Sequence, residues 1–499
     1  MQSNKKVQSN RRGSFYALIV AGLLGATTLT GSVGHAANLN PVNTPQVALN
    51  NAPAEGFADL VDAVMPSVVS VRSKYVPVAA QSEDQFNGNG QQFQFGFPPG
   101  FEQFFRNQPG GKNMPSPRSG GGTAQGSGFI VSKDGYVVTN NHVINDASEV
   151  SVKFSDGREY DAKVIGADPK TDLALLKIQS RDTFKPVKFA SGKPRVGDWV
   201  LAVGNPFGLG GTVTTGIISA SGRDIGAGPY DDFLQIDAPI NRGNSGGPAF
   251  NLKGEVVGIN TAIFSPSGGS VGIGFAIPAS TAETIIADLK ENGNVTRGWL
   301  GVQIQPVTAD IADSIGLGKP TGTLIAAVTE SSPAQKSGLM VGDTILKVDG
   351  KVVDGPKELS REVAKIKPGT AVEMTVFRAG KERDISVSIG QMPDSKQASV
   401  ESETMGQPTS ESSLGLALAP SESGEGVIVA DVAPDSPAAE QGIVQGDIIL
   451  EVNGASVNQP EAVVAAIGQS AKKSARAPIL LLVKNQQGQR FVALKTAEG

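Results

Sequence analysis

The sequence predicts a mainly β protein in which a long β-rich domain precedes two copies of a smaller α+β module. In the first part, short β-branched runs alternate with Asp-Gly or Lys-Gly turns, as in "GFIVSKDGYVVT" and "PAFNLKGEVVGIN". This pattern is typical of antiparallel hairpins and favours one or two all-β barrels or sandwiches. In the last third, "SSPAQKSGLMVGDTILKVDG" (331–350) and "DSPAAEQGIVQGDIILEVNG" (435–454) agree at half of their twenty aligned positions, so one module occurs twice.

Residues 1–37 have the pattern of a secretory signal peptide. An apolar stretch without charges follows four basic residues, Lys5, Lys6, Arg11 and Arg12. The small residues of "GHAA" allow cleavage after Ala36 or Ala37, which leaves residues 38–55 as an N-terminal segment. The apolar stretch is short for a membrane span, so export is favoured over an uncleaved anchor helix. The adjacent arginines leave twin-arginine export open beside the general secretory route.

Composition excludes several classes of chemistry. The chain has no cysteine, which rules out disulfides, thiol nucleophiles and cysteine-bound metals. Removal of the four basic residues takes the formal net charge from -5 to -9, so nothing suggests a nucleic-acid binder. Of the two histidines, His35 lies in the signal peptide and leaves His142 as the only imidazole of the mature chain.

Two segments without strand or helix periodicity interrupt this organisation. Residues 77–123, rich in Gly, Gln, Pro and Phe, are expected to form a long loop inside the β-rich domain (56–293). Its phenylalanines are compatible with a contact surface and equally with disorder. A helix over 280–293, with Ser280 as its cap, closes that domain. The second segment, 392–412, is a predicted linker between the two modules, 297–391 and 413–499.

Both modules resemble PDZ domains. Each carries "GD.IL.V(D/N)G" and begins with a similar short motif, "WLGV" at 299–302 and "SLGL" at 413–416. The resemblance makes these the carboxylate-binding loops, with the residues Leu300, Gly301, Val302, Leu414, Gly415 and Leu416. In PDZ recognition a peptide adds as an extra strand and the loop amides bind its C-terminal carboxylate. The alternative is a pair of structural β-modules with blocked grooves.

The strongest candidate nucleophile is Ser245, in "INRGNSGGP" (240–248). A serine hydroxyl needs an adjacent base and donors for the oxyanion that forms at the attacked carbonyl. The surrounding glycines let the backbone turn sharply and aim the amides of Gly243 and Ser245 at one point. A glycine-rich hairpin turn without catalytic function is the structural alternative.

The order of residues along the chain separates two kinds of hydrolase. In α/β-hydrolases the G-x-S-x-G serine comes first and the histidine last. Here His142 precedes Ser245, which excludes that arrangement and fits the order histidine, aspartate, serine. Eight acids lie between them: Asp146, Glu149, Asp156, Glu159, Asp161, Asp168, Asp172 and Asp182. We choose Asp172 because it heads an apolar strand, where a carboxylate can be buried against the imidazole; a capping role is the alternative.

Six motifs together resemble the HtrA/Deg family of serine proteases: "GSGFIV", "YVVTNNHVI", "TDLALLKI", "VGNPFGL", "INRGNSGGP" and "GIGFAIP". The two PDZ modules point to its Do-like periplasmic members, of the DegP and MucD type. The resemblance implies a chymotrypsin-like double β-barrel with His142, Asp172 and Ser245 as the catalytic triad. It also implies substrate contacts by Ile240, Gly243, Asn244, Thr261, Ala262, Ile263 and Phe264. The uncharged side chains among these favour cleavage after small or medium aliphatic residues.

The resemblance further implies ATP-independent cleavage of unfolded or misfolded envelope proteins in the periplasm, as part of quality control and the stress response. The PDZ domains would capture C-termini or exposed segments, and the chain would form homotrimers or larger homo-oligomers. No cofactor is expected, because the sequence has no G-x-x-x-x-G-K-[ST] phosphate loop and no imidazole cluster for a metal. Two alternatives are a PDZ-based binding protein on an inactive barrel and a protein that mainly holds unfolded chains.

Overall fold

The computed structural model describes residues 56–75, 123–393 and 410–495, except positions 209, 242, 266–268, 412–413, 422–423 and 474–477. The predicted signal peptide, residues 38–55 and most of the loop 77–123 lie outside the described residues, as does most of the linker 392–412. Within the described part, no helix is long and apolar enough to cross a membrane.

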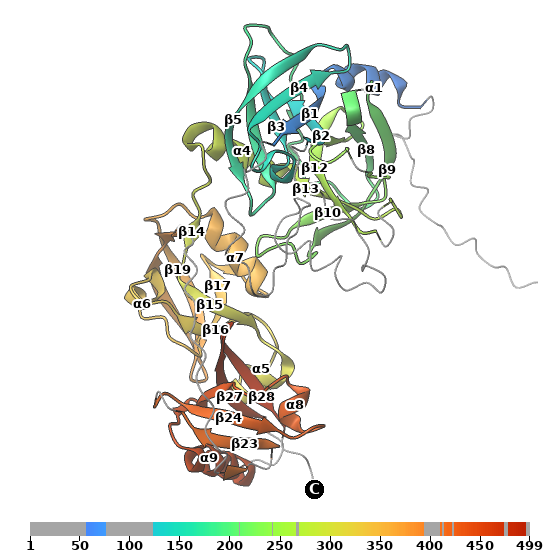
Figure 1. Cartoon of the computed structure of the whole chain (residues 1–499). Coiled ribbons are helices and arrows are strands. Elements are labelled where there is room, and N and C mark those ends of the chain that lie inside the picture. Colours follow the sequence, from blue (N-terminus) through green and yellow to red (C-terminus); the bar gives the residue numbers. More distant parts are fainter. Residues whose placement is uncertain are drawn as a thin grey trace, which may run out of the picture. The chain divides into compact units, whose positions relative to one another are not determined.

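Six antiparallel strands form a first closed barrel (Figure 1), in the order β1-β2-β3-β6-β5-β4. The strands are β1 (Val68–Lys74), β2 (Thr123–Ile130), β3 (Tyr136–Thr139), β4 (Glu149–Phe154), β5 (Glu159–Asp168) and β6 (Leu173–Ile178). Helix α1 (Ala58–Val64) precedes them, and α3 (Asn141–Ile144) follows β3. Along β4 and β5, more buried residues alternate with more exposed ones, as expected for strands with one face on the core and the other in water.

A second barrel follows, in the order β11-β8-β9-β10-β13-β12, and the pairing of β11 with β12 closes it. Its strands are β8 (Trp199–Gly204), β9 (Thr212–Arg223), β10 (Phe233–Ile236), β11 (Pro248–Phe250), β12 (Glu255–Ile263) and β13 (Gly274–Pro278). The short β7 (Lys188–Phe189) adds to β12 in parallel. Helix α4 (Ala279–Asn292) ends at Gly293, whose φ is +74°. The expected cap is wrong: Pro278, not Ser280, occupies the N-cap position, because the chain enters the helix directly from β13.

One hydrophobic core joins the two barrels. Alternate residues of a strand point to opposite sides, so Leu173 and Leu175 of β6 enter the shared core while Ala174 and Leu176 fill the first barrel. Strand β8 divides its residues in the same way between the shared core and the interior of the second barrel. This double burial explains why "LALLKI" and "VLAV" are continuous apolar runs. The predicted chymotrypsin-like pair of barrels is confirmed.

The two PDZ modules share one order of elements, to which the first module adds α5 and β21 (Figure 1). The first contains β14 (Gly298–Trp299), β15 (Val302–Pro306), α5 (Ala309–Ile315), β16 (Thr323–Val328), α6 (Pro333–Ser337), β17 (Thr344–Val348), β18 (Lys351–Val352), α7 (Pro356–Lys365), β19 (Ala371–Arg378), β20 (Lys381–Ser388) and β21 (Gly390–Gln391). The second contains β22 (Ser410–Glu411), β23 (Leu416–Pro420), β24 (Val427–Val432), α8 (Pro437–Glu440), β25 (Ile448–Val452), β26 (Ala455–Ser456), α9 (Pro460–Lys473), β27 (Ile479–Asn485) and β28 (Gly488–Leu494).

The repeated residues have repeated roles. Ser332 and Ser436 cap α6 and α8, since each side chain accepts a hydrogen bond from a backbone N–H of its helix. The aspartates of the two "GD" motifs are buried and each faces an arginine, Arg378 in the first module and Arg490 in the second. The sequence repeat therefore records shared caps and ion pairs as well as shared strands.

We expect Leu175→Ala to lower the free energy of unfolding of the protease domain by about 2–5 kcal/mol, because its side chain is fully buried in the shared core. Urea unfolding monitored by Trp199 fluorescence, in a Trp299→Phe background, measures this change. Val196→Ala is the matched control, since Val196 is 63% exposed and its loss should change the free energy by less than about 0.5 kcal/mol. Equal effects of the two substitutions would contradict the shared core.

Candidate active site

Asp172 is the most highly connected polar residue of the site. It is 4% exposed. Its Oδ2 lies 2.7 Å from Nδ1 of His142 and accepts a hydrogen bond of 2.6 Å from the Thr261 hydroxyl. Its Oδ1 accepts from the backbone N–H of His142 at 2.9 Å. Both carboxylate oxygens are therefore engaged, and two bonds to the same histidine orient the imidazole.

The turn "TNNHV" is built around the backbone of Asp172. Asp172 has a φ of +57°, a left-handed conformation that is uncommon outside glycine. Its carbonyl accepts hydrogen bonds from the side-chain amide of Asn140 at 2.9 Å and from the backbone N–H of Asn141 at 3.1 Å. The asparagines before His142 thus hold the aspartate in the conformation that lets its carboxylate reach the ring.

Ser245 lies in a tight turn that packs against the first barrel. Its carbonyl accepts a hydrogen bond of 2.8 Å from the backbone N–H of Ser127 on β2. Gly246 has a φ of +82°, and a Cβ there would lie 2.3 Å from the carbonyl oxygen of Ser127 and 2.5 Å from the Thr139 hydroxyl. Only glycine allows this approach, which explains the glycine after the serine.

Thr261 links Ser245 to the histidine and aspartate. Its hydroxyl donates to Asp172, and its carbonyl lies 3.4 Å from the Ser245 Oγ. Since Asp172 and His142 come from the first barrel and the other two from the second, the structure brings all three predicted triad residues to the barrel interface. Sequence reasoning assigned Thr261 only to substrate contact and missed its bond to Asp172, which has no signature in the motif.

The other predicted substrate contacts differ in exposure. Ile240, Asn244 and Ala262 are buried, and Ile240 belongs to the core of the second barrel. Ile263 and Phe264 are half-buried, and the backbone N–H of Phe264 donates to the Ile273 carbonyl at 3.0 Å.

The predicted carboxylate loops of the PDZ modules have the same local structure. Gly301 and Gly415 have φ values of +81° and +80°. A Cβ on either would lie within 2.3 Å of the Cβ of the helix-capping serine, Ser332 or Ser436. The remaining residues anchor these loops: Leu300, Leu414 and Leu416 are buried, and Val302 is half-buried.

The two PDZ modules differ at the strand that follows the carboxylate loop. In the first, the chain before the loop, β14, pairs with β21 at the end of the module. In the second, the corresponding segment β22 pairs antiparallel with β23 itself and also contacts α9. β22 therefore adds to the edge of the second module as an extra strand, which is the way in which peptides bind to PDZ domains.

Loop 223–233 connects the protease domain with helix α7. Asp231 is buried and accepts hydrogen bonds from the backbone N–H groups of Ile225 and Ala227. Lys357 of α7 lies 3.5 Å from this carboxylate and also contacts Asp224, and Arg361 donates to the Asp231 carbonyl at 2.5 Å.

A second connection lies close to Asp172. Arg297, just before β14, makes a buried ion pair with Asp168 at the end of β5, and its guanidinium lies 4.8 Å from the ring centre of Tyr230. The sequence carried no signal for this pair, because its partners are far apart along the chain.

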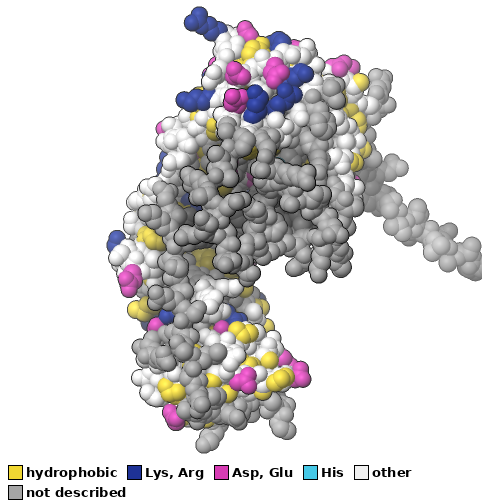
Figure 2. Space-filling model, in the orientation of Figure 1, with side chains coloured by type: hydrophobic (Ala, Val, Ile, Leu, Met, Phe, Trp, Pro, Cys, Tyr) yellow, Lys and Arg dark blue, Asp and Glu magenta, His cyan; other side chains and the backbone are white. Residues whose placement is uncertain are grey.

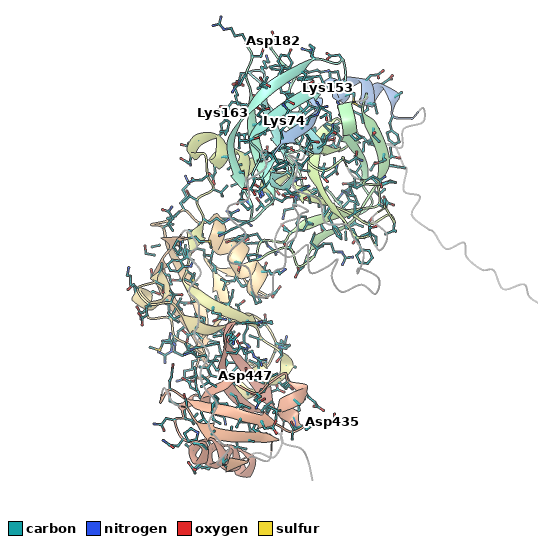
Figure 3. All side chains as sticks on the ribbon, viewed as in Figure 1. Lys74, Lys153, Lys163, Asp182, Asp435 and Asp447 are labelled. Carbon is teal, nitrogen blue, oxygen red and sulfur yellow. The ribbon has the colours of Figure 1, made fainter. Side chains whose placement is uncertain are left out.

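The outer face of the first barrel carries mixed charges. Figure 2 shows basic and acidic side chains side by side there, and Figure 3 labels Lys74, Lys153 and Lys163 on its strands. Lys74 pairs with Glu149 at 2.7 Å, and Arg158 pairs with Asp156 at 2.8 Å. Among the described residues, no group of three or more His, Cys, Asp or Glu is arranged to hold a metal ion.

Comparison with known families defines the class of protein. A model of the trypsin-like peptidase domain matches residues 126–259, and PDZ-domain models match residues 298–389 and 404–483. The fold and these matches define a serine endopeptidase that carries two PDZ domains.

Relatives define the family. The chain is 49% identical to a "Probable periplasmic serine endoprotease DegP-like" of Brucella suis biovar 1, and the alignment covers 99% of each chain. It is 46% identical to a protein of the same name from Rhizobium meliloti, with 96% of this chain and 99% of the relative covered. Among solved structures, the HtrA-type protease AlgW with a decapeptide has a TM-score of 0.55 at 38% identity, covering 68% of this chain and 100% of AlgW. The chain belongs to the DegP-like periplasmic serine endoproteases of the HtrA family, and the predicted family and activity are confirmed.

The pH dependence of stability should report on loop 223–233. Burial raises the pKa of Asp231 above its ordinary value of 3.8. The Asp231 carboxyl group therefore binds a proton more tightly in the folded protein than in the unfolded chain. Its contribution to the free energy of unfolding falls as the pH rises from 3.8 through the raised pKa. We expect Asp231→Asn to make this fall shallower in melting temperatures measured between pH 4 and 7.

Asp156→Asn provides a control of opposite sign. The backbone hydrogen bond from Arg158 lowers the pKa of Asp156, so its contribution is lost as the pH falls. This variant should lose less stability than the wild type as the pH falls below 3.8, so the melting temperatures are measured below that pH as well. A change of slope in the same direction for both variants would contradict the assignment.

Proposed function

We propose that His142, Asp172 and Ser245 form the catalytic triad of this protease. The observation that carries the proposal is the doubly bonded carboxylate of Asp172, which orients His142 and shares Thr261 with Ser245. In this mechanism His142 takes the Ser245 proton as the oxygen attacks the peptide carbonyl, and returns it to the leaving amine. Asp172 stabilises the imidazolium that forms between these steps. The backbone amides of Gly243 and Ser245 receive the oxyanion.

The proposed substrates are unfolded or misfolded proteins of the cell envelope, cleaved in the periplasm without ATP. The periplasmic names of the relatives support the compartment, and the PDZ domains support capture of exposed segments or C-termini. Ile240, Gly243, Asn244, Thr261, Ala262, Ile263 and Phe264 are the proposed substrate contacts. The apolar members favour a small or medium aliphatic side chain before the cleaved bond. We also propose a homotrimer or larger assembly and holding of unfolded chains, by resemblance to the family.

Peptide capture is proposed for the first PDZ domain. Its strand β15 lies at the edge of the sheet beside α7, whereas β22 runs along the equivalent strand β23 of the second domain. The solved structures of the HtrA-type protease AlgW with a decapeptide and with a tripeptide support peptide binding by this chain. Gly301 and its neighbours would bind the peptide carboxylate through backbone amides.

Calorimetric titration with a decapeptide that ends in an apolar residue tests this assignment. We expect about one peptide per chain in the Ser245→Ala background. Glu411→Pro should raise this to about two, because proline cannot donate to a ladder and disfavours the pairing of β22 with β23. Glu411→Ala keeps the backbone N–H and should leave one. Two peptides per chain without any substitution at Glu411 would contradict occupation of the second groove.

Ser245→Ala should abolish the degradation of unfolded casein, with a loss in kcat of about 10⁶-fold. Melting temperature and binding of casein should persist, since the bond that the Ser245 Oγ makes to the Thr261 carbonyl is long, at 3.4 Å. Asp172→Asn should lower kcat by about 10⁴-fold. Gel electrophoresis of casein and the turnover of a fluorogenic peptide measure these effects. Undiminished proteolysis by Ser245→Ala would refute the triad, and a wild type that prevents aggregation without cutting would favour the holding function.

A further inference from the structure

We propose that Ser127, the serine of "GSGFIV", is the positioning residue of the oxyanion hole. The inference rests on the proposed function, because it assigns to Ser127 the task of holding the Gly243 and Ser245 backbones in place. Ser127 lies on β2 of the first barrel, is fully buried, and reaches the turn of the nucleophile in the second.

Ser127 contacts both residues that carry the proposed oxyanion donors. Its backbone N–H donates to the Ser245 carbonyl at 2.8 Å, and its hydroxyl donates to the Gly243 carbonyl at 2.6 Å. Its own carbonyl accepts from the Thr139 hydroxyl at 2.7 Å. Thr139 ends β3, directly before the turn that carries His142. One residue thus links the nucleophile, the oxyanion turn and the strand of the base.

The direction of the Ser127 hydroxyl proton follows from its partners. A serine hydroxyl has one proton to donate and lone pairs to accept. The backbone N–H of Asn205 donates to the Ser127 Oγ at 2.9 Å and occupies a lone pair. A carbonyl oxygen can only accept, so the proton of Ser127 points to Gly243. This hydrogen bond is short and is shielded on the Ser127 side, where the serine is fully buried, while Gly243 is half-buried.

Gly243 needs an external restraint. It has a φ of +99°, and a residue without Cβ imposes few limits on the two peptides that it joins. The N–H of the same residue is the proposed oxyanion donor. The fixed Gly243 carbonyl holds the peptide between Gly243 and Asn244, and the Asn244 carbonyl, which accepts from the Gly247 N–H at 3.0 Å, holds the next peptide, which carries the Ser245 N–H. With the peptide on its C-terminal side held, Gly243 has fewer orientations for its own N–H. Since donors for an oxyanion must be in place before charge develops, this restraint should act on the transition state more than on bound substrate.

Gly204 leaves space for the Ser127 side chain. A Cβ on Gly204 would lie 3.0 Å from the Ser127 Oγ and 2.4 Å from the Asn244 Oδ1. The glycine of "VGNPFGL" therefore leaves room for the serine and for Asn244 at the same time. Because Ser127 reaches the turn only through backbone atoms of Gly243 and Ser245, it acts by positioning them.

Ser127→Ala tests this role, with Ser70→Ala as the matched control. Ser70 lies directly opposite Ser127 in the pairing of β1 with β2, is 2% exposed, and accepts a hydrogen bond from the Gln125 side chain. Both variants remove a buried hydroxyl from the same barrel. Only Ser127→Ala removes the bond to Gly243.

The measurements are kcat and KM for a fluorogenic peptide and the inhibition constant of a peptide boronic acid of the same sequence. The boronate forms a tetrahedral adduct with the nucleophilic serine and so depends on the oxyanion hole. We expect Ser127→Ala to lower kcat by about 10- to 100-fold with KM within about two-fold, and to weaken the boronate by a similar factor. Ser70→Ala should change neither. Melting temperatures show that each variant is folded.

Ser127→Cys decides the question if Ser127→Ala does not fold. A thiol is a weak donor, so this variant should show a smaller loss in kcat, again with unchanged KM. Wild-type kcat and boronate affinity in a folded Ser127 variant would overturn the positioning role, as would a loss that appears only in KM. Either result, combined with an inactive Ser245→Ala, leaves the proposed triad standing. Activity in Ser245→Ala would instead refute the triad itself.

Discussion

The hydrogen bond between Asp172 and Thr261 is the contact on which the site depends. Asp172 belongs to the first barrel and Thr261 to the second, and their side chains meet at 2.6 Å in a buried position. A buried carboxylate is stable only where its oxygens are fully hydrogen-bonded, and here two backbone or ring nitrogens of His142 complete the set. Because the buried carboxylate needs these partners, His142 and the second barrel are held in fixed positions around it.

The shared core keeps the two barrels, and therefore Asp172 and Thr261, in fixed relative positions. Strands β6 and β8 each send alternate side chains into the core between the barrels, so neither barrel can shift without opening apolar surface. Ser127 makes a second rigid contact between the barrels. It lies on a strand of the first barrel and holds the carbonyls of a glycine-rich turn of the second. The flexible Gly243, one of the two proposed oxyanion donors, is thus held by a neighbouring strand.

The two PDZ modules share one sequence pattern but differ at the strand that follows the predicted carboxylate loop. Both place a glycine with positive φ against a capping serine, and both bury the aspartate of "GD" against an arginine. They differ in the short segment that precedes the carboxylate loop. That segment closes the first module against its own last strand and lies along the groove strand of the second.

Much of the fold and part of the site could be predicted from the sequence for local reasons. Turn residues and β-branched runs determine hairpins, the internal repeat determines two modules, and the position of His142 before Ser245 determines the order of the candidate triad. Glycines at 243, 246, 301 and 415 are visible in the sequence because close backbone approaches tolerate no side chain. Only tertiary structure decided that Thr261 bonds to Asp172, that Ser127 reaches Gly243, that Arg297 pairs with Asp168, and that β22 pairs with β23. Each of these contacts joins residues that the packing of barrels or strands brings together. The sequence around a hydrogen-bonding side chain does not indicate which distant residue will be its partner.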